Sequence, residues 1–172
     1  IDRDTMLAPA AAVEAAITPR TRVLLPVHYA GAPVDMDAYR TIAQKHGLVL
    51  IEDAAHAIGT EYKGRHVGSQ ETAIFSLHPI KNITTAEGGI VTTHDEELYN
   101  AVKRLKFHGI AKDAWDRYSK KGAGTVLEVI EPGLKYNMPD MIASLGLTQL
   151  PKLARFNARR TELAARYDQL LA

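Results

Sequence analysis

The sequence predicts an α/β protein whose mostly parallel sheet carries helices on both faces. Short apolar runs alternate along the chain with segments in which apolar residues recur at helical spacing. Strands that alternate with helices in this way are typical of a doubly wound, mostly parallel sheet. The chain starts at Ile1 without a methionine and stops inside a helical pattern that lacks a stop signal, so we expect an incomplete part of such a fold.

Local signals define the elements in the first third of the chain. A short helix over 9–17 starts with proline, which favours the first position of a helix. The uninterrupted apolar run at 23–28 predicts a strand covered on both faces. Residues 35–46 carry apolar side chains at helical spacing and are closed by Gly47, and a strand over 48–52 follows them.

The middle of the chain contains a hairpin, two strands and a helix. A small hairpin is expected over 60–67, with its turn at 63–64, where a glycine follows a lysine. Two further apolar runs predict strands over 72–76 and 89–93. The segment 95–107 begins with an aspartate that can cap a helix, and its spacing is helical.

The last third of the chain is mainly helical. The pattern is loose from 109 to 133, where we expect a mobile loop. Helical spacing returns over 137–149, and Pro151 is expected to start a second segment. That segment has an apolar face formed by Leu153, Phe156, Leu163, Tyr167 and Leu170, and we expect Arg155, Arg159, Arg160 and Arg166 to form its solvated face.

Composition excludes several classes of function. The 172 residues carry 21 lysines and arginines against 20 acidic residues, so the net charge of +1 gives no reason to expect nucleic acid or an anionic membrane as a partner. Cysteine is absent, which excludes disulfides, thiolate metal sites and iron–sulfur clusters within this chain, and no acid–histidine spacing fits a metal site. No apolar run reaches membrane-spanning length, so we expect a cytoplasmic protein.

Two strand ends deliver charged groups that can face one ligand. Asp53 follows the apolar strand at 48–52, and Lys81 comes shortly after the strand at 72–76. Ligands of open α/β sheets bind at the carboxyl ends of the strands. A carboxylate that holds a protonated ring nitrogen and a lysine that forms an imine are what pyridoxal phosphate requires. At about 3 Å the carboxylate would gain roughly 5 kcal/mol at an effective dielectric constant of 20, before desolvation.

Each of these residues also has an ordinary structural explanation. Asp53 could cap a following helix, and Lys81 could be an exposed loop lysine, although the spacing 81 − 53 = 28 leaves room for a crossover and a return strand. Ser76 could donate its hydroxyl to a phosphate or could be a core serine. His56 could lie beside the phenolic oxygen of the ring or could serve only the fold.

These residues lie within stretches that resemble the DegT/DnrJ-type sugar aminotransferases, which belong to the fold-type I pyridoxal-phosphate enzymes. The resemblance covers nearly all 172 residues. Within the family, the motifs Asp-Ala-Ala-His-Ala, Lys-Asn-Ile-Thr and Lys-Phe-His-Gly most resemble the 4-amino-4-deoxy-L-arabinose branch. Enzymes of that branch aminate a UDP-4-keto-pentose with glutamate for lipid A modification. The stretches that carry the resemblance are 26–37, 52–57, 75–78 with 81–82 and 87–89, and 135–138 before a helix that contains 146–150.

The resemblance implies a role for each residue of the site. Lys81 would form the imine with pyridoxal phosphate and shuttle the proton, and Asp53 would hold the pyridine nitrogen. His56 would lie at the ring oxygen, and Ser76 would bind the phosphate. Asn137 matches an asparagine that reaches the phosphate of the neighbouring subunit, which implies a homodimer with shared active sites.

The resemblance also sets limits and leaves alternatives. It implies that residues 1–137 are part of the cofactor-binding large domain and that 138–172 lead toward a small C-terminal domain. Family members have that small domain and an earlier phosphate-binding loop, so we expect this chain to be an internal fragment. Relatives that dehydrate sugars have histidine in place of Lys81, which favours an aminotransferase. A pyridoxal-phosphate-sensing regulator and a fragment that is inactive alone are the alternatives.

Overall fold

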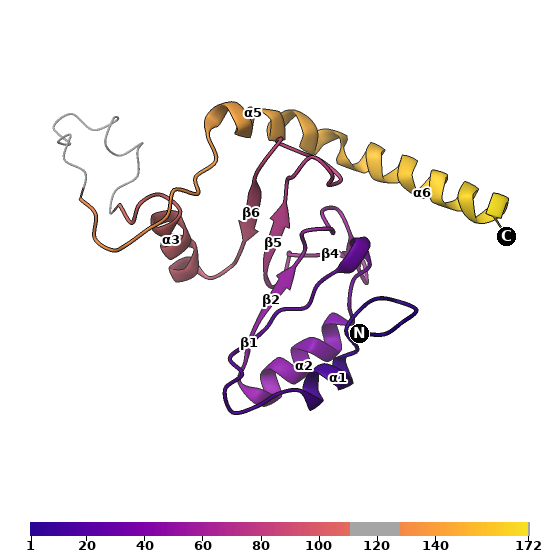
Figure 1. The fold of residues 1–172 in the computed structure, drawn as a ribbon, viewed down its shortest axis with the longest axis horizontal. Coiled ribbons are helices and arrows are strands. Elements are labelled where there is room, and N and C mark those ends of the chain that lie inside the picture. The colour runs from indigo at the N-terminus through magenta and orange to yellow at the C-terminus, as the bar shows by residue number, and fades with distance from the viewer. Residues whose placement is uncertain (111–127, 172) are drawn as a thin grey trace. The chain divides into compact units, whose positions relative to one another are not determined.

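The computed structural model describes residues 1–110 and 128–171, and the chain divides into two compact units. One unit comprises residues 1–93 together with 140–172, and the other comprises 94–139. Figure 1 shows the course of the chain and labels most of its helices and strands. The division between 1–137 and 138–172 that the sequence suggests stays a prediction.

The first unit begins with two helices that pack on strand β1 (Val23–Leu24). Helix α1 spans Ala10–Ala15 directly after Pro9, and helix α2 spans Met36–His46. The carboxylate of Asp35 accepts the N–H of Ala38 at 3.2 Å and so caps α2, whereas Gly47 ends it with a φ of 61°. Both helices confirm the elements predicted from spacing and caps.

The larger of two apolar clusters lies between these helices and the sheet. The hydroxyl of Tyr39 is buried with the cluster and donates to the carbonyl of Ala8 at 3.0 Å. Burial of such side chains contributes about 1.5–3 kcal/mol each and fixes α2 on the sheet. The buried members of the cluster are Leu24, Val34, Met36, Tyr39, Ile42 and Ala43.

The sheet has the strand order β1-β2-β5-β6. Strands β1, β2 (Val49–Asp53) and β5 (Thr72–Ser76) run parallel, whereas β6 (Gly89–Thr92) runs antiparallel to β5. The predicted mostly parallel α/β sheet is therefore confirmed. The register places Asp53 opposite Ile74, so β2 and β5 end near each other at one edge.

The first apolar run forms less strand than its composition predicts. Only Val23 and Leu24 pair regularly, and Val27 forms a separate bridge with Asp53. Pro26 lacks an N–H and cannot donate to the ladder, so the strand is interrupted there. The expected cover on both faces is wrong for the described residues, because Val23, Leu25 and Val27 remain 44–53% exposed.

A short antiparallel hairpin follows β2. Strand β3 spans Glu61–Tyr62 and strand β4 spans Arg65–His66. Lys63 and Gly64 have φ angles of 50° and 76°, which is the backbone of a two-residue type I′ turn. The hairpin predicted from this dipeptide is confirmed.

The second unit is built around helix α3 (Glu96–Leu105), whose first turn is capped by Asp95. The segment after the helix pairs with residues that come later in the chain, through a bridge between Phe107 and Lys135. Arg104 also donates to Glu131 at 2.7 Å. Of the mobile loop expected over 109–133, residues 111–127 lie outside the described part of the chain.

The chain re-enters the first unit through two helices. Helix α5 spans Asp140–Gln149, a 3-10 turn spans Leu150–Lys152, and helix α6 spans Leu153–Leu171. Pro151 lies inside the 3-10 turn, so the predicted second segment starts as a regular helix two residues later. Neither helix contains a buried residue. None of the described helices combines the length and apolarity needed to cross a membrane.

Candidate active site

Two predicted site residues end neighbouring parallel strands. Asp53 is the last residue of β2, and Ser76 is the last residue of β5. The strands are joined just beyond Asp53, where the N–H of Ala54 donates to the carbonyl of Ile74 at 2.9 Å. The two side chains therefore belong to the same carboxyl edge of the sheet, which is where open α/β sheets bind ligands.

Asp53 has an unused carboxylate oxygen. One oxygen accepts the N–H of Ala55 at 3.1 Å, and the carboxylate forms no ion pair with any residue that the structure describes. The following residues form a turn closed by the N–H of Ala57 on the carbonyl of Ala54, so Asp53 caps no helix. A partly buried carboxylate without a cationic partner suits a cationic group of a ligand.

His56 contacts the loop that follows β1. Its ring lies 5.7 Å from that of Tyr29, and its Nδ1 accepts the N–H of Ala30 at 3.3 Å. Ala30 reaches this position with a φ of 52° in the short turn over Tyr29–Gly31. Because Nδ1 accepts, the neutral ring carries its proton on Nε2. His56 thus offers an N–H donor that no described residue uses.

Lys81 lies in the segment between β5 and β6, which we call the lysine loop (residues 77–88). The carbonyl of Leu77 accepts the N–H of Thr85 at 3.1 Å and the hydroxyl of Thr84 at 2.9 Å, and these bonds close the base of the loop. The N–H of Lys81 donates to the carbonyl of His78 at 3.0 Å. Lys81 is partly buried, and within residues 1–110 and 128–171 its amine has no hydrogen bond and no ion pair.

Ser76 supplies a hydroxyl at the start of this loop. Its Oγ accepts the N–H of His78 at 3.3 Å, so the hydroxyl hydrogen can point to an acceptor such as a phosphate oxygen. Asn137 belongs to the second unit, where its side-chain oxygen accepts the amine of Lys135 at 2.7 Å. Its role across a subunit interface stays a prediction.

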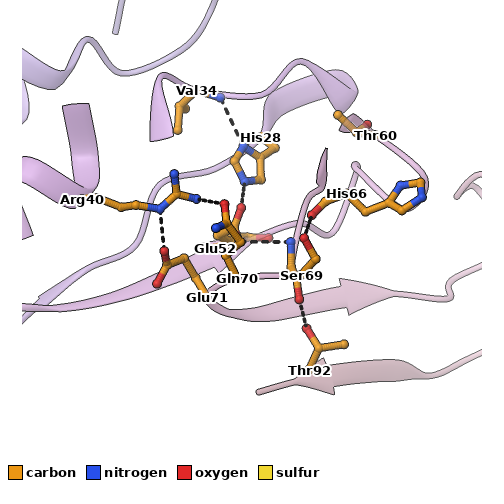
Figure 2. Close-up of polar contacts among 12 residues, drawn as sticks. His28, Val34, Arg40, Glu52, Thr60, His66, Ser69, Gln70, Glu71 and Thr92 are labelled. Atoms are coloured by element: carbon orange, nitrogen blue, oxygen red, sulfur yellow. Dashed lines mark hydrogen bonds and ion pairs between the residues drawn. The ribbon is translucent and has the colours of Figure 1, made fainter. Parts of the chain in front are cut away.

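The sequence did not reveal a buried hydrogen-bonded pair next to Asp53. His28 and Glu52 are 0% and 2% exposed, and their side chains meet at 2.9 Å, as Figure 2 shows. Alternation along β2 turns Glu52 to the opposite side of the sheet from Asp53. An acid that directly continues an apolar strand needs a buried partner, and a histidine at the end of the neighbouring strand was the signal for it.

Among the described residues, a mostly parallel sheet has an unpaired carboxylate at the carboxyl edge where open α/β sheets bind ligands, and the loop after the neighbouring strand carries a lysine without a partner. The whole chain, residues 1–172, matches the DegT/DnrJ/EryC1/StrS aminotransferase family, and the chain belongs to this family. The family resemblance stated from the sequence is therefore confirmed. The more specific assignment to the 4-amino-4-deoxy-L-arabinose branch is a separate question.

Solved structures agree with the family assignment. PseC of Helicobacter pylori, an aminotransferase involved in the biosynthesis of pseudoaminic acid, is 33% identical with a TM-score of 0.88, over 98% of this chain and 43% of PseC. Spr1654 of Streptococcus pneumoniae is 35% identical with a TM-score of 0.88, over 98% and 47%. DesV of S. venezuelae is 38% identical with a TM-score of 0.83, over 96% and 42%. The chain spans less than half the length of each.

The cofactor expected from the sequence is that of the family. Spr1654 is described in a PMP form and in a PLP form, which are the two states of pyridoxal phosphate in amino transfer. The groups at the sheet edge fit this cofactor. They comprise a carboxylate and an amine that form no ion pair among the described residues, together with a hydroxyl and an imidazole N–H, from Asp53, Lys81, Ser76 and His56.

Proposed function

We propose that the intact protein transfers an amino group from glutamate to a keto-sugar nucleotide. The observation that carries the proposal is the Lys81 amine, which has no partner among the described residues and follows the strand that ends beside Asp53. Such a lysine can exchange its proton, which a catalytic amine must do. The presence of lysine at this position, where dehydrating relatives have histidine, favours amino transfer.

In this proposal, three residues bind the cofactor and one transfers the proton. Asp53 binds the protonated ring nitrogen, and this interaction keeps the ring positively charged. Ser76 donates its hydroxyl to the phosphate, and His56 donates Nε2–H to the ring oxygen. Lys81 takes a proton from the substrate carbon and returns it at the neighbouring position. The bound cofactor stores the amino group and accepts the electron pair released when that proton leaves.

The substrate follows from the family branch. The stretches at 53–57, 81–84 and 106–109 favour a UDP-4-keto-pentose and a place in lipid A modification. The relatives named for pseudoaminic acid biosynthesis and as sugar aminotransferases support a sugar as the acceptor of the amino group. We further propose a cytoplasmic homodimer in which Asn137 reaches the neighbouring subunit's site.

Covalent capture of the cofactor tests the role of Lys81. Condensation of the lysine amine with the aldehyde of pyridoxal phosphate releases one water, and borohydride then adds hydride to the carbon of the C=N bond while solvent supplies the proton. Peptide mass spectrometry of the intact protein should find the label on Lys81, and Lys81→Ala should abolish it. Lys63→Ala, which removes a surface lysine paired with Asp37, is the control. A label that survives Lys81→Ala would contradict the proposal.

Spectral titration tests the substrates. Glutamate should convert the bound cofactor to its amino form, and only the correct keto-sugar nucleotide should restore the aldehyde form. A UDP-4-keto-pentose is the expected restoring sugar. If a hexose nucleotide restores the spectrum and the pentose does not, the amino-transfer mechanism stands and the assignment of the branch is wrong.

A further inference from the structure

Helix α6 binds the backbone directly after Lys81. The side-chain amide of Asn82 donates to Asn157 Oδ1 at 3.1 Å, and the carbonyl of Asn82 accepts from Arg160 at 3.1 Å. Arg160 also donates to the same oxygen of Asn157 at 3.4 Å. The three residues thus form a closed set of hydrogen bonds between α6 and the lysine loop.

Arg160 differs from its neighbours on the helix. Arg159 pairs with Glu162 within α6, and the guanidinium of Arg155 lies 5.4 Å from the ring of Phe156. The sequence places all these arginines on a solvated face, and Arg160 is exposed there, but it also binds the lysine loop, which the sequence did not predict. A guanidinium presents several N–H groups in a fixed plane, so it can bind the Asn82 carbonyl and the Asn157 side chain together.

The base of the lysine loop is held independently of α6. The bonds of Leu77 with Thr84 and Thr85 close it, and α5 packs against it where Gly146 approaches Thr85. Nearer the tip, Ile83 is buried, and α6 holds the side chain of Asn82 and the peptide that joins Asn82 to Ile83. Removal of the α6 contacts would therefore loosen the backbone at Lys81 and leave the base of the loop closed.

We propose that Asn157 and Arg160 are positioning residues for Lys81. They hold the carbonyl and side chain of Asn82, and this sets the direction in which the preceding lysine presents its amine. Without them, the loop has to be ordered when the cofactor condenses with Lys81, and affinity falls by the cost of that ordering. The inference rests on the proposed role of Lys81 as the lysine that binds the cofactor.

Two cofactor forms separate positioning from folding. Pyridoxal phosphate has an aldehyde that condenses with the Lys81 amine and releases water, whereas pyridoxamine phosphate has an amine there and cannot. The ratio of the two dissociation constants, measured by equilibrium titration of the intact protein, therefore reports how well Lys81 is presented. A loss of general stability would weaken the binding of both forms alike.

Arg160→Gln and Asn157→Ala should each weaken pyridoxal phosphate binding by about three- to tenfold, as expected for one or two hydrogen bonds. Binding of pyridoxamine phosphate should stay unchanged. Asn157→Asp keeps an acceptor oxygen for Asn82 and should therefore keep most of the preference for pyridoxal phosphate over pyridoxamine phosphate. Arg159→Gln is the matched control on the same helix and should change neither constant. In the Lys81→Ala background, Arg160→Gln should not change the ratio of the two dissociation constants any further.

The outcomes distinguish this inference from the function on which it rests. If Arg160→Gln weakens both cofactor forms equally, α6 serves the fold alone and the inference is overturned. The same conclusion follows if Lys81→Ala abolishes the preference for the aldehyde form but Arg160→Gln preserves it. If Lys81→Ala itself leaves the preference intact, the proposed function is wrong and the inference falls with it.

Discussion

His28 donates its Nε2–H to Oε2 of Glu52 (Figure 2) over 2.9 Å, and both side chains are buried. The direction of this bond follows from the other ring nitrogen, since Nδ1 accepts the N–H of Val34 at 3.2 Å and so carries no proton. The second oxygen of Glu52 accepts the N–H of Gly68 at 3.0 Å. One carboxylate therefore joins three segments of the chain.

This pair supports the backbone of Asp53. The N–H of Asp53 donates to the carbonyl of Pro26 at 2.9 Å, and its carbonyl accepts the N–H of His28 at 3.0 Å. The segment that carries His28 is thus bonded to β2 twice, through the side chain of Glu52 and through the backbone of the next residue. Asp53, the proposed partner of the cofactor's pyridine nitrogen, lies at the end of this hydrogen-bonded strand.

Replacing Glu52 with glutamine should cost about 1–3 kcal/mol of unfolding free energy, because His28 and Gly68 donate to different carboxylate oxygens and the amide NH2 would replace one of these acceptors. Urea denaturation measures the loss. The matched control is Glu71→Gln, which keeps an acceptor for Arg40 at a partly exposed ion pair and should cost less than about 1 kcal/mol. Equal losses in the two variants would show that the buried carboxylate is not needed as a double acceptor.

Sequence patterns predicted the elements whose signals are local. Helix α2 carries its own cap at Asp35 and its own stop at Gly47, and the hairpin carries its turn at Lys63 and Gly64. These residues act on backbone within a few positions, so a linear pattern contains the information. The mostly parallel sheet followed from the order of the elements, because parallel neighbours require crossover connections.

Contacts between segments that are distant in the sequence could not be predicted from local sequence signals. His28 and Glu52 lie 24 positions apart, and Asn82 and Asn157 lie 75 positions apart. Arg160 has the same helical surroundings as Arg159, and only the packing of α6 on the lysine loop distinguishes the two. Residue types suggested the candidate site, whereas the residues that brace it depend on tertiary packing.

The acid stability of α2 should depend on Tyr62. Its hydroxyl donates to Asp35 at 2.7 Å and is the main cause that lowers the pKa of this carboxyl below its ordinary 3.8, with the N–H of Ala38 as the next cause. A carboxyl whose pKa is lower in the folded state stabilises the fold above the unfolded pKa, and this stabilisation disappears as the pH falls through the folded pKa. Tyr62→Phe should therefore raise the pKa of Asp35 toward 3.8 and lower stability near neutral pH.

Carbon-detected NMR titration of Asp35 measures this shift directly. Urea denaturation should show a difference between Tyr62→Phe and the unmodified protein that shrinks as the pH falls through the folded pKa of Asp35, because the carboxyl then becomes protonated in the folded as well as the unfolded state. Tyr99→Phe, which removes a hydroxyl from α3, is the control and should leave Asp35 unchanged. An Asp35 pKa that does not move in Tyr62→Phe would contradict the assigned cause.

The imidazole of His56 should be replaceable by a side chain that keeps an N–H donor. Its Nδ1 accepts from Ala30, so the neutral ring offers Nε2–H to the ring oxygen of the proposed cofactor. His56→Leu removes this donor and should weaken pyridoxal phosphate binding by about tenfold, the expected worth of one hydrogen bond to a charged oxygen. His56→Gln retains an amide N–H and should lose less.

Equilibrium titration with pyridoxal phosphate distinguishes the two variants, and His66→Leu, at an exposed position in the hairpin, is the control for loss of a histidine. Nitrogen NMR of the neutral imidazole should also find its proton on Nε2, because the Ala30 N–H occupies the lone pair of Nδ1. If His56→Leu binds as tightly as His56→Gln, the ring donates no hydrogen bond to the cofactor. In that case the contact with Ala30 only shapes the loop after β1.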